Sequence, residues 1–417
     1  MGRDDDRPGE LDPQIASVRD HAADHLDRAV ALRRRLHEWP EVGLDLPRTR
    51  DEVLAELEDL PLDVTLHETT SGVTALLEGS SPGPTLLLRG DMDALPMPED
   101  TDLDFASRVD GCMHACGHDT HVAMLTSAAR VLAERRDEIA GRVLLMFQPG
   151  EEGHHGARHM LDEGLLDVPP LADGTESPVD AAFAIHTTSA LPTGWVSTRG
   201  GALMASADVL RITVTGRGGH ASEPHRALDP VPVACEIVTA LSSMITRSID
   251  PFDPAVLTVG SIHAGTTNNV IPETASIEGT IRAVSEGTRA KVHDGLRRVA
   301  EGIAAAHGCG AEVTLDVGYP VTVNHDGFAD FALGLAGEVA GPGAVVELPH
   351  PVMGAEDFSY VLHRLPGAMV FLGATPHGVD PSTVAPNHSN RVRFEESAMG
   401  TGIALHVAAA LRHLAPA

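Results

Sequence analysis

One cysteine and one histidine in a short segment of the chain have the spacing of a metal site. Cys116 and His118 are separated by a single glycine and precede an apolar, helix-forming run over residues 122–133. A thiolate and a neutral imidazole are the ligands that borderline-soft divalent metals prefer. Asp119 and Thr120 are candidates for the cap of the helix that follows. The segment therefore predicts a metal site at a loop-to-helix junction.

The other cysteines bear on this interpretation. The chain of 417 residues has four cysteines, and their irregular spacing argues against a disulfide framework: Cys112, Cys116, Cys235 and Cys309. A disulfide between Cys112 and Cys116 is the alternative to metal binding.

Further polar side chains follow three predicted buried strands, at residues 85–88, 143–147 and 181–185: Asp91, Asp93, Glu151, Glu152 and His186. In open α/β sheets ligands bind beyond the carboxyl ends of the strands, so we expect these side chains to lie close together. The side chains of adjacent glutamates diverge at a strand end, so one can bind a metal while the other acts as a base. The alternatives are solvated surface charges, a core histidine and turn-forming aspartates.

The elements that must position these residues follow two patterns. Up to residue 197 strands alternate with helices, which predicts an α/β fold with a doubly wound sheet. Between residues 208 and 317 the order is strand, helix, strand, strand, helix, strand, which is typical of a split βαβ (ferredoxin-like) α+β domain. The prediction is a catalytic domain in two parts, residues 14–197 and 319–417, with a lid or dimerisation domain inserted at residues 198–318.

The N-terminal segment carries two further expectations. Residues 1–13 are rich in Asp, Arg and Pro and are expected to be disordered. Apolar residues then recur at helical spacing from Ile15 to Leu36, which predicts one amphipathic helix that ends before Pro40. His37 and Glu38 begin a zincin-like motif, but position 41 is a glutamate, so we reject that interpretation.

The composition excludes several classes of partner. The formal net charge of −30 would repel nucleic acid and anionic membrane surfaces. No apolar run is long enough to cross a bilayer, and residues 1–10 are too polar for a secretory signal peptide. We therefore expect a cytoplasmic protein whose partners include neither nucleic acid nor membrane.

Six motifs follow one another along the chain: Gly90-Asp-Met-Asp-Ala-Leu-Pro96, Met113-His-Ala-Cys-Gly-His-Asp119, Gln148-Pro-Gly-Glu-Glu-Gly153, Gly218-Gly-His-Ala221, Asn269-Val-Ile-Pro272 and Gly354-Ala-Glu-Asp-Phe-Ser359. Together they resemble the motif series of the aminoacylase/carboxypeptidase superfamily of dimetal hydrolases. Within it they are most similar to the amidohydrolase branch that includes hippurate hydrolases and indole-acetyl-amino-acid hydrolases. The resemblance covers nearly the whole chain from about Leu32 onward.

The resemblance implies a metal centre and a base. Two divalent ions per subunit (zinc, manganese or cobalt) would have five ligands: Cys116, His118, Glu152, His186 and His388. Glu151 would be the general base, and Asp93 would orient a metal-binding histidine. Asp91 stands where the wider superfamily has a further histidine ligand, as is usual in this branch.

The inserted domain is expected to contribute substrate contacts. His220 and Asn269 look like the family's oxyanion and substrate contacts, delivered when that domain closes. Arg282 could pair with a substrate carboxylate, since arginine suits bidentate recognition; a surface charge is the alternative. The domain also resembles one that dimerises in relatives, which implies a homodimer.

The expected function is hydrolysis of small-molecule N-acyl-amino acids to a carboxylic acid and a free amino acid. A dipeptidase or carboxypeptidase on the same scaffold is the first alternative. A catalytically silent metal-binding or sensor protein is the second, although such a protein would be expected to lack the base at Glu151.

Overall fold

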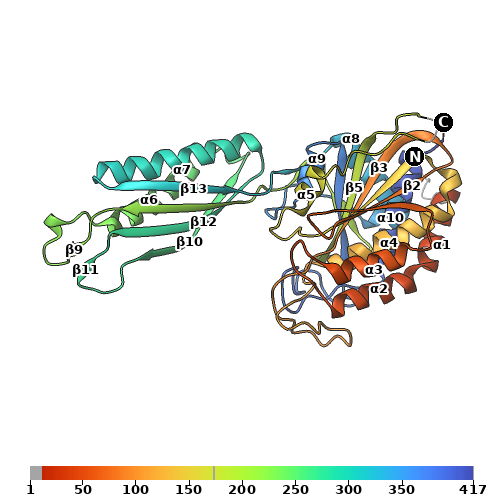
Figure 1. The fold of residues 1–417 in the computed structure, drawn as a ribbon, viewed down its shortest axis with the longest axis horizontal. Helices are drawn as coiled ribbons and strands as arrows, with labels where there is room; N and C mark the ends of the chain where they lie inside the picture. Colours follow the sequence, from red (N-terminus) through yellow and green to blue (C-terminus); the bar gives the residue numbers. More distant parts are fainter. Residues whose placement is uncertain (1–11, 172–173, 417) are drawn as a thin grey trace, which may run out of the picture. The chain divides into compact units, whose positions relative to one another are not determined.

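The computed structural model describes residues 12–171 and 174–416, which divide into two compact units (Figure 1). The first unit comprises the described residues of Met1–Gly201 together with Asn324–Pro349 and Tyr360–Ala417. The second comprises Ala202–Val323 and His350–Ser359. Most of the predicted disordered leader lies outside the described residues, but its last residue, Pro13, already belongs to a helix.

The first unit is built on one eight-stranded mixed sheet. In spatial order its strands are β1 (Leu62–Leu66), β2 (Val73–Glu78), β4 (Ala140–Gln148), β3 (Ser81–Asp91), β5 (Val179–Pro192), β16 (Gly367–Thr375), β6 (Val196–Thr198) and β15 (Val345–Glu347). The central strands β4, β3, β5 and β16 pair in parallel, and the neighbours β2 and β6 pair with them in antiparallel fashion. Every residue of β4 after Ala140 is buried, so both faces of the sheet are covered there.

The helices that lie wholly or mostly in this unit are α1 (Pro13–Asp24), α2 (Leu26–Glu38), α3 (Pro47–Leu57), α4 (His118–Glu134), α5 (Gly156–Asp162), α8 (Asp326–Ala340), α9 (Ser359–Leu362) and α10 (Ala398–His413). Two 3₁₀ turns, η1 (Arg136–Glu138) and η3 (Pro342–Ala344), join them. Among the described residues, no helix combines the length and the apolar character needed to span a membrane.

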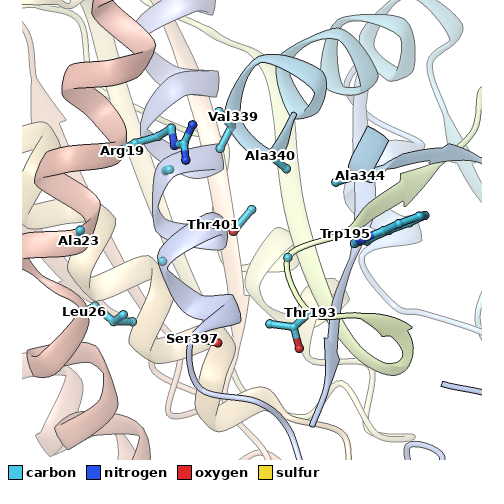
Figure 2. Close-up of a pocket in the computed structure, with 13 residues that line it drawn as sticks. Arg19, Ala23, Leu26, Thr193, Trp195, Val339, Ala340, Ala344, Ser397 and Thr401 are labelled. Carbon is cyan, nitrogen blue, oxygen red and sulfur yellow. The ribbon is translucent and has the colours of Figure 1, made fainter. Parts of the chain in front are cut away.

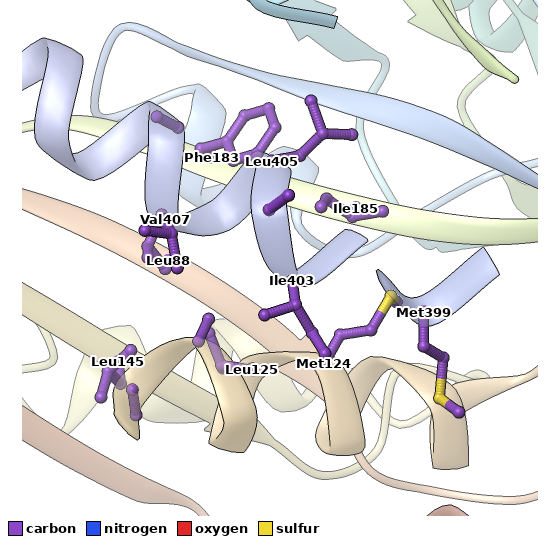
Figure 3. Close-up of a cluster of buried hydrophobic side chains, with 14 of the residues drawn as sticks. Leu88, Met124, Leu125, Leu145, Phe183, Ile185, Met399, Ile403, Leu405 and Val407 are labelled. Carbon is purple, nitrogen blue, oxygen red and sulfur yellow. The ribbon is translucent and has the colours of Figure 1, made fainter. Parts of the chain in front are cut away.

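The core beside the candidate site packs α4 and α10 against the central strands (Figure 3). Leu88 of β3, Phe183 of β5, Leu125 of α4 and Ile403 of α10 are each at most 1% exposed. Burial of each such side chain is worth about 1.5–3 kcal/mol. This apolar contact fixes the body of α4 against the strands whose carboxyl ends carry the predicted site residues.

Two local predictions for the first unit were wrong. The single helix predicted from Ile15 to Leu36 is two helices that meet at His25, because α1 packs mainly against α10 while α2 packs against α4. Strand β1 was not predicted, since it is only five residues long and its side chains are mostly exposed. It pairs only with β2 and forms the edge of the sheet.

The second unit is a two-layer α+β domain. Its antiparallel sheet has the order β10 (Ala255–Ala264), β12 (Thr274–Ala283), β8 (Asp208–Thr215) and β13 (Gly310–Val317), with two helices, α6 (Pro230–Ser248) and α7 (Glu286–Ala306). The two helices share one apolar core with the sheet, which includes Ile212, Ile237, Ile277 and Leu296. A short ribbon, β9 (Gly219–His220) and β11 (Val270–Ile271), and the turn η2 (Pro224–Arg226) complete it.

In the sequence, β7 (Gly201–Met204) and β14 (Thr322–Asn324) cross from one unit to the other. Chain order and strand order in the second unit are those of a split βαβ domain. The predicted fold class, an α/β sheet domain with a split βαβ domain, is confirmed. The roles of the units, catalytic for the first and lid or dimerisation domain for the second, stay predictions.

Candidate metal centre

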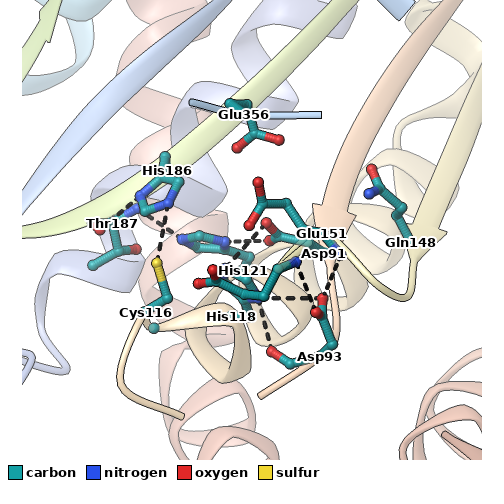
Figure 4. Close-up of polar contacts among 12 residues, drawn as sticks. Asp91, Asp93, Cys116, His118, His121, Gln148, Glu151, His186, Thr187 and Glu356 are labelled. Carbon is teal, nitrogen blue, oxygen red and sulfur yellow. Dashed lines mark hydrogen bonds and ion pairs between the residues drawn. The ribbon is translucent and has the colours of Figure 1, made fainter. Parts of the chain in front are cut away.

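Eight of the predicted or considered residues meet in the first unit, near the carboxyl ends of β3 and β4: Asp91, Asp93, Cys116, His118, Glu151, Glu152, His186 and His388. Figure 4 labels six of them, all but Glu152 and His388. The eight residues come from the end of β3, the turn after β4, the middle of β5, the start of α4 and the loop before α10. The fold therefore brings together side chains that are up to about 300 residues apart in the sequence. Five of them are those that the strand-end rule predicted: Asp91, Asp93, Glu151, Glu152 and His186.

The thiol of Cys116 lies at the centre of two groups that could each hold a metal ion. One group joins it to His118 and His186, and the other joins it to Glu152 and His388; within each group the ligand atoms lie within 4.8 Å of one another. The Cys116 Sγ atom is 3.5 Å from His186 Nε2 and 3.3 Å from His388 Nε2. Ligands of a tetrahedral zinc ion lie about 3.5 Å apart, so these separations suit a common cation.

The imidazole of His118 is oriented as a metal ligand would be. Its Nδ1 atom donates a hydrogen bond to the backbone carbonyl oxygen of Asp93 at 2.8 Å, so the lone pair of the neutral ring lies on Nε2. That Nε2 atom is buried, makes no hydrogen bond among the described residues and lies 3.3 Å from Asp91 Oδ2. Burial disfavours a charge on this ring, yet the neighbouring Asp91 carboxylate and Cys116 raise the pKa of His118 well above its usual range. The site therefore attracts positive charge, which a bound cation would supply in place of the proton.

His186 shows the same arrangement. Its Nδ1 atom donates to the carbonyl oxygen of Thr187 at 2.9 Å, which leaves the Nε2 lone pair facing Cys116 Sγ. Burial, aided by the neighbouring His121, holds the pKa of His186 well below its usual range, so the ring is neutral, as ligation requires.

The charges around the centre favour a cation. Hydrogen bonds to Cys116 and Glu152 raise the pKa of His388 to about 10. Burial opposes ionisation of Glu152, yet its contacts with His388 and His118 lower the pKa of that carboxyl. The His388 Nε2 atom is 2.9 Å from Glu152 Oε1. Acidic side chains thus attract protons here, as they would attract a divalent ion.

Asp93 makes more contacts than the sequence analysis predicted. Its carboxylate accepts the backbone N–H of Glu151 at 2.9 Å and of Glu152 at 3.0 Å. The contact that orients His118 is made by the Asp93 backbone carbonyl, while the carboxylate Oδ1 atom lies 3.6 Å from the ring nitrogen. One residue therefore fixes both the histidine and the glutamate pair.

His121 and Thr187 are contributors that the sequence analysis missed. The Nδ1 atom of His121 donates to Asp91 Oδ1, and the backbone N–H of Thr187 donates to His121 Nε2 at 2.7 Å. The Asp91 Oδ2 atom is also 2.8 Å from the Arg89 guanidinium. The available signal was the position of His121 one helical turn after His118, which places both on neighbouring parts of α4.

The predicted cap of α4 was wrong. The helix begins directly after Gly117, which has φ +88° and provides no side-chain cap. Asp119 and Thr120 lie inside the first turn, where Thr120 Oγ1 donates to the Gly117 carbonyl oxygen at 2.6 Å. All four cysteines are free, so the alternative of a Cys112–Cys116 disulfide is not realised.

The remaining predicted residues, His220, Asn269 and Arg282, belong to the second unit. His220 and Asn269 line a cavity of about 490 Å³ beside the β9–β11 ribbon. Arg282 does not line it: it lies eight residues along β12 from Thr274, about 26 Å away in an extended strand. The structure brings His220 and Asn269 together and does not bring Arg282 to them.

A different cavity, of about 470 Å³, lies in the first unit between α1, α10 and the turn after β5 (Figure 2). Arg19, Thr193, Trp195 and Thr401 line it together with small and apolar side chains. None of the predicted site residues reaches it, and its lining contains no carboxylate, imidazole or thiol. It is therefore not the candidate metal centre.

Residues 87–412 match the sequence profile of peptidase family M20/M25/M40. The chain belongs to this family. As a member of it, the protein is a hydrolase of amide bonds, and the family resemblance drawn from the six sequence motifs is confirmed.

Individual relatives are similar to this chain over nearly its full length. Thermostable carboxypeptidase 1 of Saccharolobus solfataricus is 39% identical over 93% of this chain and 95% of its own length. IAA-amino acid hydrolase ILR1-like 2 of Arabidopsis thaliana is 36% identical over 93% and 85%. The crystal structure of the YXEP protein of Bacillus subtilis, a dinuclear metal-binding peptidase from the M20 family, has a TM-score of 0.79 and 32% identity, and the match covers 94% of this chain and 99% of that one.

Proposed function

We propose that the protein hydrolyses the amide bond of N-acyl-amino acids in a metal-dependent reaction that releases a carboxylic acid and a free amino acid. The observation that carries the proposal is the fully buried side chain of His118, one ring nitrogen of which lies within 4.8 Å of carboxylate oxygens of both Glu151 and Glu152. A cation bound by His118 would therefore lie beside a carboxylate that can act as a base.

We further propose that two divalent ions (zinc, manganese or cobalt) bind here, held by the five residues that the family resemblance implies: Cys116, His118, Glu152, His186 and His388. Membership of Cys116 in both ligand groups supports two neighbouring ions with one shared donor. When bound, such ions polarise an amide carbonyl and lower the pKa of water. The mixed thiolate, imidazole and carboxylate donors suit all three metals.

Glu151 is the proposed general base. The residue is 5% exposed, and its backbone N–H donates a hydrogen bond to the Asp93 carboxylate. The main chain that carries Glu151 is therefore fixed at the edge of the ligand cluster. In this proposal it accepts a proton from the attacking water and passes it to the leaving amine nitrogen. General acid–base catalysis of this kind contributes about 10²–10⁴-fold to a rate.

His220 and Asn269 are proposed substrate contacts. The Nδ1 atom of His220 accepts the backbone N–H of Ser222 at 3.1 Å, so the proton of the neutral ring lies on Nε2 and can be donated to an oxyanion. We also propose a homodimer formed through the second unit. A solution mass of twice 43.8 kDa would support it, and a mass of 43.8 kDa at working concentration would exclude it.

A peptidase is the second candidate function, favoured by the 39% identity to a carboxypeptidase. Both reactions break the amide bond that joins an acyl group to an amino acid, so the ligand cluster serves either. They differ in the acyl side of the substrate, which is an amino acid or peptide in one case and an organic acid in the other.

Substrate profiling separates the two functions. The panel would contain N-acetyl-, N-benzoyl- and indole-acetyl-amino acids beside dipeptides, assayed with chelator and after addition of manganese, zinc or cobalt. We expect metal-dependent release of free amino acid from at least one N-acyl substrate. Turnover of dipeptides alone would assign the protein to the peptidases. Two bound metals without turnover of any substrate would favour the sensor alternative.

A further inference from the structure

An arginine and a histidine one turn apart in α2 bind the residue that follows His118. Arg33 Nε donates to Asp119 Oδ2 at 2.8 Å, and His37 Nδ1 donates to the same oxygen at 2.8 Å. All three side chains are at most 2% exposed. His37 begins the zincin-like motif that the sequence analysis rejected. A role as metal ligand therefore does not explain why this histidine is buried.

The contact matters because of where Asp119 sits. It is the second residue of α4, and the helix begins at Gly117 without a side-chain cap. Each residue of this first turn instead makes a side-chain contact with another part of the unit. His118 is bound to the carbonyl of Asp93, Thr120 Oγ1 is 2.8 Å from Thr187 Oγ1, and His121 binds Asp91. Asp119 makes the contact between this turn and α2.

The donors on α2 are themselves held in place. Arg33 Nη1 donates to Glu396 Oε1 at 3.0 Å, and the Arg33 guanidinium lies 4.6 Å from the centre of the Phe105 ring. His37 Nε2 is 3.3 Å from Glu99 Oε1. The carboxylate of Asp119 therefore meets donors that have little freedom to follow it if it moves.

Fold stability alone gives a weak reason for this arrangement. A buried ion pair adds little net stability compared with apolar side chains of the same volume, since both charges lose their hydration. What such a pair does provide is a single allowed geometry. Here that geometry is imposed on the turn that carries a candidate metal ligand.

We propose that Arg33 and His37 are positioning residues for the metal centre: by holding Asp119 they fix the first turn of α4 and thereby the direction of His118 Nε2. Neither residue touches the ligand cluster. The inference rests on the proposed role of His118 as a ligand, and the indirect contacts of metal-binding histidines are typically worth 10–100-fold in metal affinity.

The chain contains a matched control. In α7, Arg289 and His293 are also four residues apart and both bind one buried carboxylate, Asp208: Arg289 Nε and His293 Nε2 lie 2.9 Å and 2.8 Å from its Oδ2 atom. This second cluster belongs to the second unit and holds no candidate metal ligand. A substitution there measures the effect of losing such a contact without touching α4.

The test is cobalt(II) titration of the chelator-treated full-length protein, followed by the visible absorption spectrum of the bound ion and by thermal unfolding of the metal-free form. His37→Leu removes the donor, while His37→Asn places an amide nitrogen near the position of Nδ1 and His37→Gln places it near Nε2. We expect the Leu and Gln variants to bind cobalt about 10–100-fold more weakly with an altered spectrum. The Asn variant should recover most of the affinity and the spectrum.

His293→Leu should lower the unfolding temperature of the metal-free protein and leave cobalt binding unchanged. The inference is overturned if His37→Leu or, should that variant not fold, His37→Gln binds cobalt with the affinity and spectrum of the unmodified protein. It is also overturned if His293→Leu weakens cobalt binding as much. Failure of the unmodified protein to bind cobalt would instead refute the proposed metal site, and the inference with it.

Discussion

The Nδ1 atom of His118 donates its hydrogen bond to the main-chain carbonyl of Asp93, at 2.8 Å, while the Asp93 carboxylate accepts the backbone N–H groups of Glu151 and Glu152. One residue thus links a histidine and a glutamate pair through different atoms. Because a substitution changes only the side chain, the two links can be separated by experiment.

Asp93→Asn should affect the glutamate pair and spare His118. The amide oxygen can still accept one backbone N–H, but its NH₂ group would face the other, so the turn that carries Glu151 and Glu152 would shift. We expect kcat to fall about 10–100-fold and one of two cobalt-binding steps to weaken, with the other retained. Calorimetric titration with cobalt resolves the two steps.

The same substitution at the exposed Asp63 provides the control and should change neither quantity. Loss of both cobalt-binding steps in Asp93→Asn would show that the carboxylate, rather than the carbonyl, orients His118.

Glu151→Gln should separate catalysis from metal binding. The amide keeps the size of the side chain and cannot accept a proton from water, so kcat should fall about 10²–10⁴-fold. Metal content should remain that of the unmodified protein, because the amide of Gln keeps an oxygen near His118 and Glu152 and because Glu151 is not among the five proposed ligands. The measurements are steady-state kinetics and elemental analysis of the purified variant.

Glu301→Gln, on the exposed side of α7, is the matched control. Full activity in Glu151→Gln would remove this residue from the role of base and require another group in its place.

Removal of metal should lower the thermal stability of the first unit. Without a cation, the His118 Nε2 atom stays buried without a hydrogen bond among the described residues, and the carboxylate of Glu152 lies close to the thiol of Cys116. A ligand at 100 times its Kd stabilises the folded form by about 2.7 kcal/mol, which corresponds to a rise in Tm of several degrees. Scanning calorimetry at increasing zinc or manganese concentration measures it.

The expected signature is a Tm that falls with chelator and rises with metal concentration, with no such change in Cys116→Ser. An equal response in that variant would mean that the stabilising ion binds elsewhere.

The strand-end rule predicted most of the cluster, and its success has a physical reason. Asp91, Glu151 and His186 are far apart in sequence, but β3, β4 and β5 run parallel. The middle of β5, where His186 lies, is level with the carboxyl ends of β3 and β4. Apolar runs identified these strands because the sheet is buried on both faces. The order of elements in the second unit could be predicted for a similar reason, since its strands alternate between a buried and an open face.

Contacts between residues far apart in the sequence override local preferences, and they explain what the sequence did not predict. Asp119 has the residue type of a helix cap, but 82 and 86 residues before it in sequence His37 and Arg33 offer stronger, charge-assisted partners. His388 reaches Cys116 across 272 residues from a backbone with φ 68°; the family resemblance implied this ligand, while no local pattern indicates it. Contacts of this kind depend on the finished fold, and local propensity carries no information about them.

His406 of α10 should make stability depend on pH. It is 1% exposed, its ring centre lies 5.7 Å from that of Phe183, and its Nδ1 atom has no hydrogen-bond partner among the described residues. Burial, with a smaller effect of His121, lowers the pKa of His406 to about 3. In the unfolded chain a histidine has a pKa of about 6.5.

Between these two values the unfolded chain binds the proton and the folded chain does not. Stability from this group is therefore complete above pH 6.5 and is lost as the pH falls toward 3, by up to about 1.4 kcal/mol per pH unit. His406→Leu should remove this dependence. The free energy of unfolding of the unmodified protein should fall by about 2 kcal/mol more than that of the variant between pH 6.5 and pH 5.

Denaturant unfolding in the presence of chelator measures the difference without interference from metal release. His263→Leu, at an exposed position of β10, is the control and should follow the unmodified protein at every pH. Parallel curves for the unmodified protein and His406→Leu would show that water or a shifted α10 lets the buried ring take up a proton in the folded state. In that case the acid sensitivity of the protein would have to come from other groups.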